Sequence, residues 1–349
     1  MAETVLEIHN RMLKNTGDSF DKSNGSFIYD VTKAAGLEFE KTQNEIAAVE
    51  EKLDVENLKD DELARFVYQR TGVKRKLATK AVTTVVISGS EGSTVSQGDL
   101  VSTELLNFVV LENATIPQSG QITVFVACEL YGAIGNVPAN TITRFPVTIN
   151  GLINVYNPEP ITNGYEAESD ADLRKRYYNK LQRPGKAGNK YHYEEWANEV
   201  VGVGGVRVIP KFNGPLTMKV VIIDSNKQPA SAELIESVEG HIRNEMPFGV
   251  EELLVVSASP VVINQSVKLI KSGTSTNEIV ESNIKRSITD YLKSIAFESD
   301  YVSYAKIGGL IIESDGVIDY SDLTVNGGTS NIPIGIDEVT VLGMITCTY

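Results

Sequence analysis

Alternate carboxylates at Glu168, Asp170 and Asp172 have the spacing with which an EF-hand calcium loop begins. Such a loop also needs glycine at its sixth position and glutamate at its twelfth, where this chain has Leu173 and Asn179. Acidic side chains in the first turn of a helix have a separate use, because they offset the positive end of the helix dipole. The pattern therefore predicts a helix N-terminus, with Ser169 or Asp170 as its cap, and no calcium site.

The three histidines, His9, His192 and His241, lie far apart in the sequence. A zinc site needs three or four ligands at a recognisable spacing, and none of these residues has a histidine or cysteine partner at such a distance. His192 and Trp196 fall on one predicted helix, where the histidine is best interpreted as a polar shoulder on an apolar face. We predict no metal and no cofactor.

Other candidate motifs also favour structural explanations. Gly202–Val208 lacks the order of a dinucleotide-binding loop and precedes a strand, so it reads as a helix-to-strand turn. Glu194 and Glu195 are adjacent and point to different sides of a helix, so they cannot act as a catalytic pair. The basic triplet Arg174–Arg176 is typical of a solvated or salt-bridged helix face. No nucleophile elbow, metalloprotease motif or Walker loop occurs, so the sequence predicts a protein that is not an enzyme.

Composition narrows the class further. The chain has 349 residues, 42% of them hydrophobic, which is enough for several packed cores. Its net charge of −14 argues against nucleic-acid binding and against electrostatic attachment to a membrane. Two cysteines do not make a disulfide framework. Because the N-terminus resembles no signal peptide and no run of 18 apolar residues occurs, we expect synthesis in the cytoplasm and no membrane insertion.

The elements that must position these residues divide into four predicted domains. Residues 1–80 have a helical period and form an arm, with a break at Gly36, a helix cap at Asp60 and a stop at Gly72. An apolar, heptad-like face on this arm is formed by Phe39, Ile46, Val49 and Leu53.

Beyond the arm, the apolar period changes. In residues 81–150, apolar side chains recur at every second position between glycine-containing turns, which predicts a small β-domain. Residues 151–259 and 260–349 each mix helical and strand periods. They predict two α+β sandwich domains, with helices on one face of a small antiparallel sheet. The predicted fold class is α+β and multidomain.

Several segments of the chain resemble the baseplate J family of contractile phage tails. The segment "ELYGAIGNVPANTI" carries Gly132, Gly135, Asn136 and Pro138 in the order of that family's most recognisable turn. "GLINVYNPEPITNGYEAESDADLRKRY", which contains Asn157-Pro158, and "GNKYHYEEWANEVVGVGGVRVIP" are similar to its following blocks. The similarity spans about residues 27–349 and is most specific in the central part.

The residues of these turns also have a physical rationale. Gly132 and Gly135 permit positive φ at a tight strand exit, and Pro138 excludes a strand interior. Asn157 and Pro158 are turn initiators. We expect these residues to hold the chain on a fixed path from the β-domain to the next domain.

The resemblance implies a structural role in the baseplate wedge, the ring around the tail hub that rearranges when the sheath contracts. It implies as partners a second copy of the chain, a smaller third wedge subunit, neighbouring wedges, and sheath-initiator and hub proteins. It places the protein in the tail baseplate of a virion, or of a phage-tail-like particle such as a bacteriocin. The arm face from Phe39 to Leu53 is the candidate for a helical bundle in this wedge.

Two other classes of function remain as alternatives. A receptor- or glycan-binding tail module would need exposed aromatic side chains on a loop or a β-face. A hydrolase in an unfamiliar fold would need a cleft with converging titratable groups.

Overall fold

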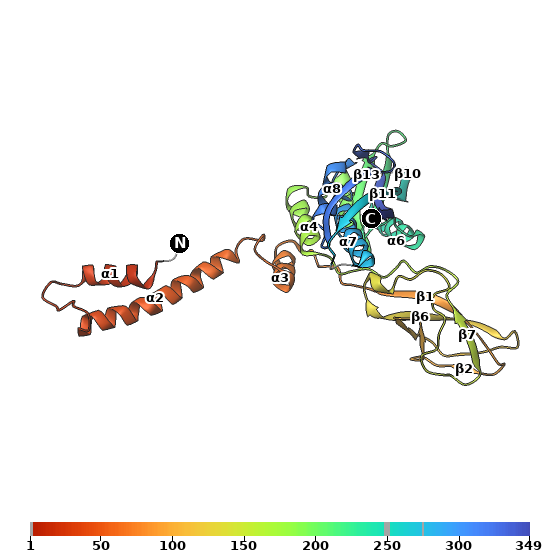
Figure 1. Ribbon diagram of the computed structural model, residues 1–349, viewed down its shortest axis with the longest axis horizontal. Helices are drawn as coiled ribbons and strands as arrows, with labels where there is room; N and C mark the ends of the chain where they lie inside the picture. The colour runs from red at the N-terminus through yellow and green to blue at the C-terminus, as the bar shows by residue number, and fades with distance from the viewer. Residues whose placement is uncertain (1–2, 248–251, 274–275) are drawn as a thin grey trace. The chain divides into compact units, whose positions relative to one another are not determined.

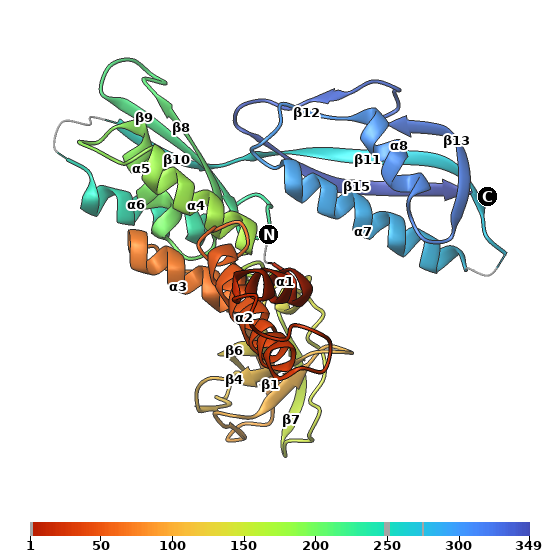
Figure 2. The same cartoon turned by 90° about the vertical axis from the view of Figure 1, so that its left-hand side faces the viewer.

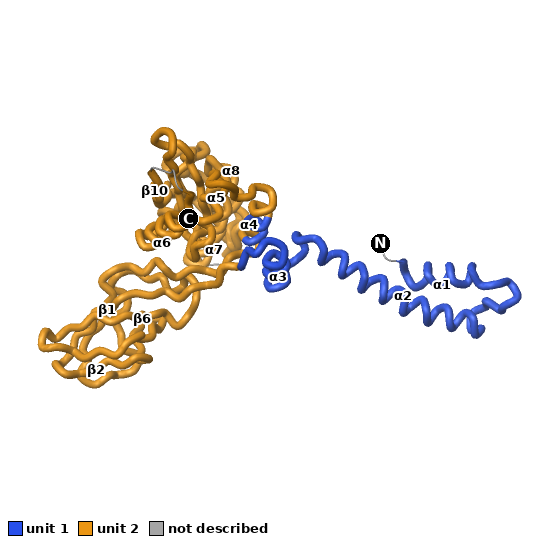
Figure 3. The backbone as a smooth tube through the Cα atoms, turned by 180° about the vertical axis from the view of Figure 1, so that it is seen from behind, with its two compact units in different colours: residues 1–74, 173–177 blue, residues 75–172, 178–349 orange. Residues whose placement is uncertain are grey.

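The structure of the protein is a computed structural model that describes residues 3–247, 252–273 and 276–349 (Figure 1). The chain divides into two compact units (Figure 3). The first unit contains Met1–Lys74 and a short part of a later helix, Leu173–Tyr177, and the second contains the rest of the chain.

Three helices form most of the first unit, namely α1 (Val5–Asn15), α2 (Phe27–Glu51) and α3 (Asp60–Thr71). Helix α1 begins at a capping box, in which the Thr4 side chain accepts from the Glu7 backbone and the Glu7 carboxylate accepts from the Thr4 backbone. Helix α2 begins where the Ser26 hydroxyl accepts from the backbone N–H of Tyr29. The predicted helical arm is thus a hairpin of α1 on α2, followed by α3.

The predicted break at Gly36 is wrong. Helix α2 runs through this position without interruption, and Gly36 is buried against α1. A Cβ atom there would lie 3.3 Å from the backbone oxygen of Val5, which is tighter than most such contacts. The glycine therefore serves close approach of the two helices rather than a change of chain direction.

The start of α3 also differs from the prediction. Its N-cap is Lys59, which makes no side-chain cap bond, whereas Asp60 is the first helical residue. The predicted stop is confirmed, because Gly72 ends the helix with a left-handed φ of 73°. Of the two alternatives predicted for the basic triplet, a solvated or a salt-bridged face, Arg174 fits the second, because its Nε lies 4.0 Å from the Glu56 carboxylate. Its side chain is 18% exposed and donates to the backbone oxygens of Val55 and Leu58 in the first unit.

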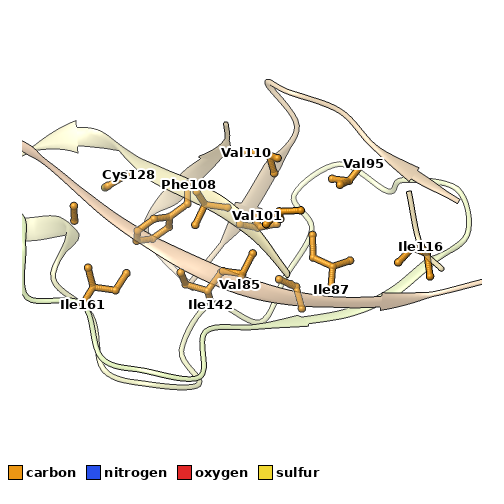
Figure 4. Close-up of a cluster of buried hydrophobic side chains, with 14 residues drawn as sticks. Val85, Ile87, Val95, Val101, Phe108, Val110, Ile116, Cys128, Ile142 and Ile161 are labelled. Carbon is orange, nitrogen blue, oxygen red and sulfur yellow. The ribbon is translucent and has the colours of Figure 1, made fainter. Parts of the chain in front are cut away.

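The second unit begins with a β-domain. Its strands are β1 (Lys80–Gly89), β2 (Thr94–Val95), β3 (Leu100–Ser102), β4 (Asn107–Val110), β5 (Ala114–Thr115), β6 (Gln121–Tyr131) and β7 (Leu152–Tyr156). Five of them form a sheet in the order β3-β4-β6-β1-β7, and β2 pairs with β5. Figure 4 shows the core of this domain, where Phe108, Val85 and Ile142 are fully buried. A single 3-10 turn, η1 (Ala133–Gly135), follows β6.

A central α+β domain follows. Its elements are α4 (Asp170–Gln182), α5 (Lys190–Glu199), β8 (Val203–Pro210), β9 (Thr217–Asp224), α6 (Ala232–Glu245) and β10 (Glu252–Ser257). The sheet order is β10-β9-β8, and one of its faces packs against α5 and α6. Leu234, Val238 and Ile242, which recur every four residues, form the buried face of α6.

The C-terminal domain repeats this combination of sheet and helices. Its elements are β11 (Ser259–Lys271), α7 (Asn277–Ile295), β12 (Tyr301–Val302), α8 (Tyr304–Ile312), β13 (Val317–Val325), β14 (Ile332–Pro333) and β15 (Glu338–Thr348). The main sheet has the order β13-β11-β15, and α7 and α8 pack on it (Figure 2). The shorter strands β12 and β14 form a separate pair.

Both of these sheets are mixed, not antiparallel as predicted. Strand β10 runs parallel to β9, and β15 runs parallel to β11. In the central domain, α6 lies between the two parallel strands and returns the chain to the starting end of the sheet, as a parallel pair requires. Local sequence periods identify strands but not their relative directions.

The central and C-terminal domains share a small hydrophobic core. Val221 and Ile223 project from β9 on the side away from α5 and α6, and they pack with Ala296, Phe297 and Val339. On the same seam, Arg207 lies over the Phe297 ring at 4.7 Å and donates to the backbone oxygens of Gly335 and Ile336. Lys219 pairs with Asp337 at 3.0 Å. Because both faces of β9 are buried, the two domains are joined by packing as well as by the chain.

The predicted fold class is confirmed. The chain has N-terminal helices, a small β-domain and two α+β domains. The predicted boundaries at residues 80, 150 and 259 stay predictions; strand β7, which follows residue 150, pairs with β1. None of the described helices has the combination of length and hydrophobicity that crossing a membrane requires.

Replacing Phe297 by alanine tests whether the shared core couples the two domains. The change removes a half-buried ring and its contact with Arg207, so we expect the free energy of unfolding to fall by about 2 kcal/mol. Calorimetry should show that the two α+β domains unfold in one transition and that the variant shifts it to lower temperature. The control is Phe20→Ala, at a residue that is 56% exposed, which should leave this transition unchanged. Separate transitions for the two domains in the wild-type protein would contradict the coupling.

Candidate functional site

The predicted arm face is exposed to solvent in the isolated chain. The exposed fractions are 53% for Phe39, 54% for Ile46, 61% for Val49 and 68% for Leu53. Large apolar side chains exposed in a row on one helix are uncommon unless another chain covers them. We call Phe39, Ile46 and Val49 the arm stripe.

The arm stripe borders the face of α2 that α1 covers. At 100° per residue, Phe39, Ile46 and Val49 lie within about 80° of one another around α2. Thr32 and Gly36, which are buried, lie about 20° and 60° from Phe39 on the other side of it. The members of the stripe are seven and three residues apart, as core positions of a heptad repeat can be, which predicts a second helical partner for α2.

The α1–α2 hairpin has both polar and apolar contacts. The Thr32 hydroxyl lies 3.0 Å from Nδ1 of His9, and the His9 ring meets the Tyr29 ring edge-on at 4.5 Å. The backbone N–H of Val5 donates to the Glu40 carboxylate at 3.1 Å. The apolar side chain of Ile8 on α1 is also buried. These contacts fix α1 on α2, while the arm stripe stays exposed.

Leu53 differs from the other three predicted face residues. Helix α2 ends at Glu51, and Leu53 lies in the turn that follows, where its backbone N–H donates to the carbonyl of Glu50. Its side chain is exposed but is not carried by the helix. Its membership of a helical interface stays a prediction.

The predicted turn residues lie where the chain leaves the β-domain. Gly132 has a φ of 96°, and a Cβ atom there would lie 2.5 Å from the Glu166 carboxylate, which accepts from the backbone N–H of Ala133. A Cβ atom at Gly135 would lie 2.7 Å from that of Ala81 and 2.8 Å from that of Cys128. Both positions exclude a side chain. The predicted positive φ is confirmed at Gly132 and wrong at Gly135, where the need for glycine is the close approach of Ala81 and Cys128.

Asn157 holds this region through its side chain, which is fully buried. Its Oδ1 accepts from the backbone N–H groups of Thr141 and Ile142, both at 3.0 Å. Its Nδ2 donates to the carbonyls of Pro138 and Glu159, both at 2.9 Å. The amide thus satisfies four backbone groups, and Pro158 follows it as an exposed turn residue.

Asn136 continues the network toward the central domain. Its side chain makes two bonds with the backbone of Gly164, accepting from the N–H at 2.8 Å and donating to the carbonyl at 2.9 Å. The same carbonyl accepts from Nδ2 of Asn226, which lies in the turn after β9, at 3.2 Å. The exit of the β-domain is therefore bonded to the central domain through Gly164.

A buried carboxylate lies beside this junction. Asp224 is 6% exposed, and one of its oxygens accepts from the backbone N–H of Gln228 at 2.7 Å. Burial raises the pKa of Asp224 to about 6, although the bonds from Gln228 and Asn226 and the nearby Lys293 act in the opposite direction. Burial raises the pKa of Tyr165, and the negative charge of Asp224 raises it further.

The residues first considered for catalysis or metal binding have structural contacts. Asp170 pairs with Arg75, and Asp172 pairs with Lys227 at 2.9 Å while its backbone N–H is capped by Ser169, the predicted cap. His192 stacks on Trp196 at 3.9 Å, and His241 lies 2.8 Å from Glu199. Among the described residues, no group of three or more histidine, cysteine or acidic side chains is placed to hold a metal ion.

Several residues of the junction were not found from the sequence. Asn226 and Asp224 make their contacts with segments that are distant in sequence, so no local pattern marks them. One signal in the sequence does indicate this region. The continuous apolar run before Asp224 is typical of a strand that is buried on both faces.

Three family models match this chain in succession. They are the baseplate J-like protein barrel domain at residues 84–164, the baseplate J-like central domain at 185–257, and the baseplate J-like protein C-terminal domain at 263–348. Together they cover more than half of the chain, and they follow the order of the β-domain and the two α+β domains.

Similar proteins come from phages and from bacterial chromosomes. The chain is 29% identical to the phage-like element PBSX protein XkdT of Bacillus subtilis, over 98% of this chain and 97% of that protein. It is 29% identical to baseplate protein gp47 of Escherichia phage Mu, over 49% of each chain. A chain in the six-fold symmetrised cryo-EM structure of the anti-feeding prophage baseplate is similar over 97% of this chain and 90% of that one, with a TM-score of 0.44 and 10% identity.

The matched domains define the class as a structural protein rather than an enzyme. More specifically, the chain belongs to the baseplate J-like family. The resemblance inferred from the turn motifs is thus confirmed.

Replacing Asn157 by alanine tests the junction network. The change leaves two backbone N–H groups and two carbonyls without their partner, so we expect the β-domain to lose about 3 kcal/mol or more of its free energy of unfolding. Urea unfolding followed by circular dichroism measures the loss. Asn154→Ala, at an exposed position on β7, is the control and should unfold like the wild type. Equal stability of both variants would refute the assigned role of Asn157.

The pH dependence of stability tests the burial of Asp224. Because its pKa is higher in the folded than in the unfolded protein, the folded state binds the additional proton between about pH 4 and pH 6. This carboxyl therefore lowers the free energy of unfolding as the pH rises through that window, by about 3 kcal/mol. Asp224→Asn should remove this part of the slope in denaturation measured from pH 4.5 to 7.5, whereas the exposed Asp290→Asn should retain it. A slope unchanged by Asp224→Asn would exclude the interpretation.

Proposed function

We propose that this protein is a structural component of the baseplate wedge of a contractile phage tail or a phage-tail-like particle. The observation that carries the proposal is the ordered match of its three domains to the baseplate J-like models. The relatives named as a phage Mu baseplate protein and as part of a phage-like element support the same setting.

In the finer proposal, the protein forms part of the ring around the tail hub and rearranges when the sheath contracts. The shared core would let the two α+β domains move together as one block within the ring. The rearrangement would then take place at the interfaces between neighbouring wedges. Interfaces of moderate, polar character can separate and form again.

The arm stripe is the proposed site of subunit association. We propose that it enters a helical bundle with a second copy of the chain and a smaller wedge subunit. The support is that the stripe is apolar, has coiled-coil spacing, and stays exposed beside α1. Contacts with sheath-initiator and hub proteins are part of the same proposal.

Serine substitutions in the arm stripe test this function. In the strain that makes the particle, Phe39→Ser, Ile46→Ser and Val49→Ser are combined in the chromosomal copy, and particles are counted by electron microscopy and mass spectrometry. Each lost contact should cost about 1–2 kcal/mol in the bundle, so incorporation should fall at least about ten-fold.

Leu37 provides a matched control. It lies on a different side of α2 and is 54% exposed, like Phe39, so Leu37→Ser should assemble as the wild type does. Circular dichroism of each purified variant shows whether it is folded. A folded triple variant that enters particles at the wild-type level would refute the stripe as an assembly site.

A further inference from the structure

The residues that flank the arm stripe follow from its spacing. If Phe39 and Ile46 are a positions of a heptad, Val49 is the d position that follows Ile46. The g positions on one side of this seam are then Glu38 and Glu45, and both are exposed. One flank of the stripe is therefore a row of carboxylates.

The other flank also lacks positive charge. Its e positions are Gln43 and Glu50. The amide oxygen of Gln43 accepts from the backbone N–H of Glu3 at 2.7 Å, whereas Glu50 is exposed. The next g position, Lys52, lies after the end of α2 and pairs with Glu62 at 2.6 Å. Within α2, every charged residue at these positions beside the arm stripe is thus a glutamate.

The C-terminal part of α2 extends beyond α1. Glu3 is bonded to Gln43 and Val5 to Glu40, so the N-terminal end of α1 lies opposite the middle of α2. From there α2 continues past α1 (Figure 1). The stripe residues and the glutamates on this part of the helix are exposed, and they are therefore accessible to another chain.

A second copy of the chain fits this seam poorly. In a parallel pair of helices, a g residue lies opposite the e residue of the following heptad, which places Glu45 of each copy against Glu50 of the other. In an antiparallel pair, g residues face g residues and e residues face e residues, so glutamates meet again. Like charges at these positions act against association, whereas lysine or arginine on the other helix would attract the carboxylates.

We propose that the arm stripe is covered by a helix of a different protein of the assembled baseplate, whose apolar seam is flanked by lysine or arginine residues. The apolar side chains of the two seams supply the binding energy, and the carboxylates of Glu38, Glu45 and Glu50 select against a second copy of the chain at this position. Within the bundle, a second copy contacts other surfaces. The inference rests on the proposed function, because it names the chemistry of the helix that covers the arm stripe.

Charge reversal on the g flank provides the test. In the strain that makes the particle, Glu38→Lys and Glu45→Lys are combined in the chromosomal copy, and the protein in purified particles is quantified by mass spectrometry. Attractive pairs become repulsive at two positions, so incorporation should fall about ten-fold. Glutamine at the same two positions removes the attraction without adding repulsion, so that variant should lie between the lysine variant and the wild type.

Asn44 and Glu51 provide the matched control. They are exposed and seven residues apart, as Glu38 and Glu45 are, but they lie on the side of α2 opposite the arm stripe. Asn44→Lys combined with Glu51→Lys introduces two lysines at the same spacing and should assemble as the wild type does. Circular dichroism shows whether each purified variant is folded, and analytical ultracentrifugation shows whether it self-associates.

The ranking of the variants decides between partners. Incorporation that falls from wild type to glutamine variant to lysine variant, with a normal control, supports a basic partner helix. Normal incorporation of the folded lysine variant overturns the inference, and so does an equal loss of the control, because the effect would then be one of total charge. Stronger self-association of the purified lysine variant than of the wild type also overturns it. In that case a second copy occupies the stripe, since position 45 would attract Glu50 of the other copy.

These results are distinguishable from a failure of the proposed function. Each of them leaves the arm stripe as an assembly site, as long as the combined serine variant of Phe39, Ile46 and Val49 is lost from particles. Normal incorporation of that folded serine variant overturns both proposals.

Discussion

One constraint governs the N-terminal arm: part of its apolar surface remains in contact with water in the isolated chain. Helix α1 covers one side of α2 through a polar contact centred on His9 and Thr32, and Gly36 allows the close approach. The adjacent arm stripe of Phe39, Ile46 and Val49 receives no such cover. Burying a large apolar side chain contributes about 1.5–3 kcal/mol, so the stripe favours association with another helix. The α1–α2 hairpin therefore forms within one chain, but its apolar stripe needs a helix from another chain to cover it.

The second unit is held together by contacts between its own domains. Asn157 and Asn136 use side-chain amides to hold backbone segments of the β-domain exit, and Asn226 joins that exit to the central domain. Beyond this junction, the shared core around Val221 and Phe297 unites the two α+β domains. Polar junctions have defined hydrogen-bond geometry and a packed seam resists separation, so force applied to one domain reaches the next. Such a chain is suited to act by position within an assembly.

The sequence predicted where the helices and strands lie better than it predicted how they pack and pair. The helical period of the apolar residues located the N-terminal arm, and the glycine-containing turn located the β-domain exit. It failed at Gly36, where a glycine serves close packing inside a helix. It also gave no sign of the backbone contacts that Arg174 makes with Val55 and Leu58, because these partners are remote in sequence. Strand direction was also beyond reach, since parallel and antiparallel pairs share the same local period. The arm stripe was visible as a pattern, but only the structure shows that α1 leaves it exposed.

The central claim is that the protein works by docking its arm stripe into a helical bundle of the baseplate. A cryo-EM reconstruction of the intact particle, at a resolution that shows side chains, tests it most directly. If the arm stripe docks in this way, Phe39, Ile46 and Val49 are buried against helices of other subunits beside the tail hub. A reconstruction in which the baseplate contains this chain with those three side chains facing solvent would contradict it.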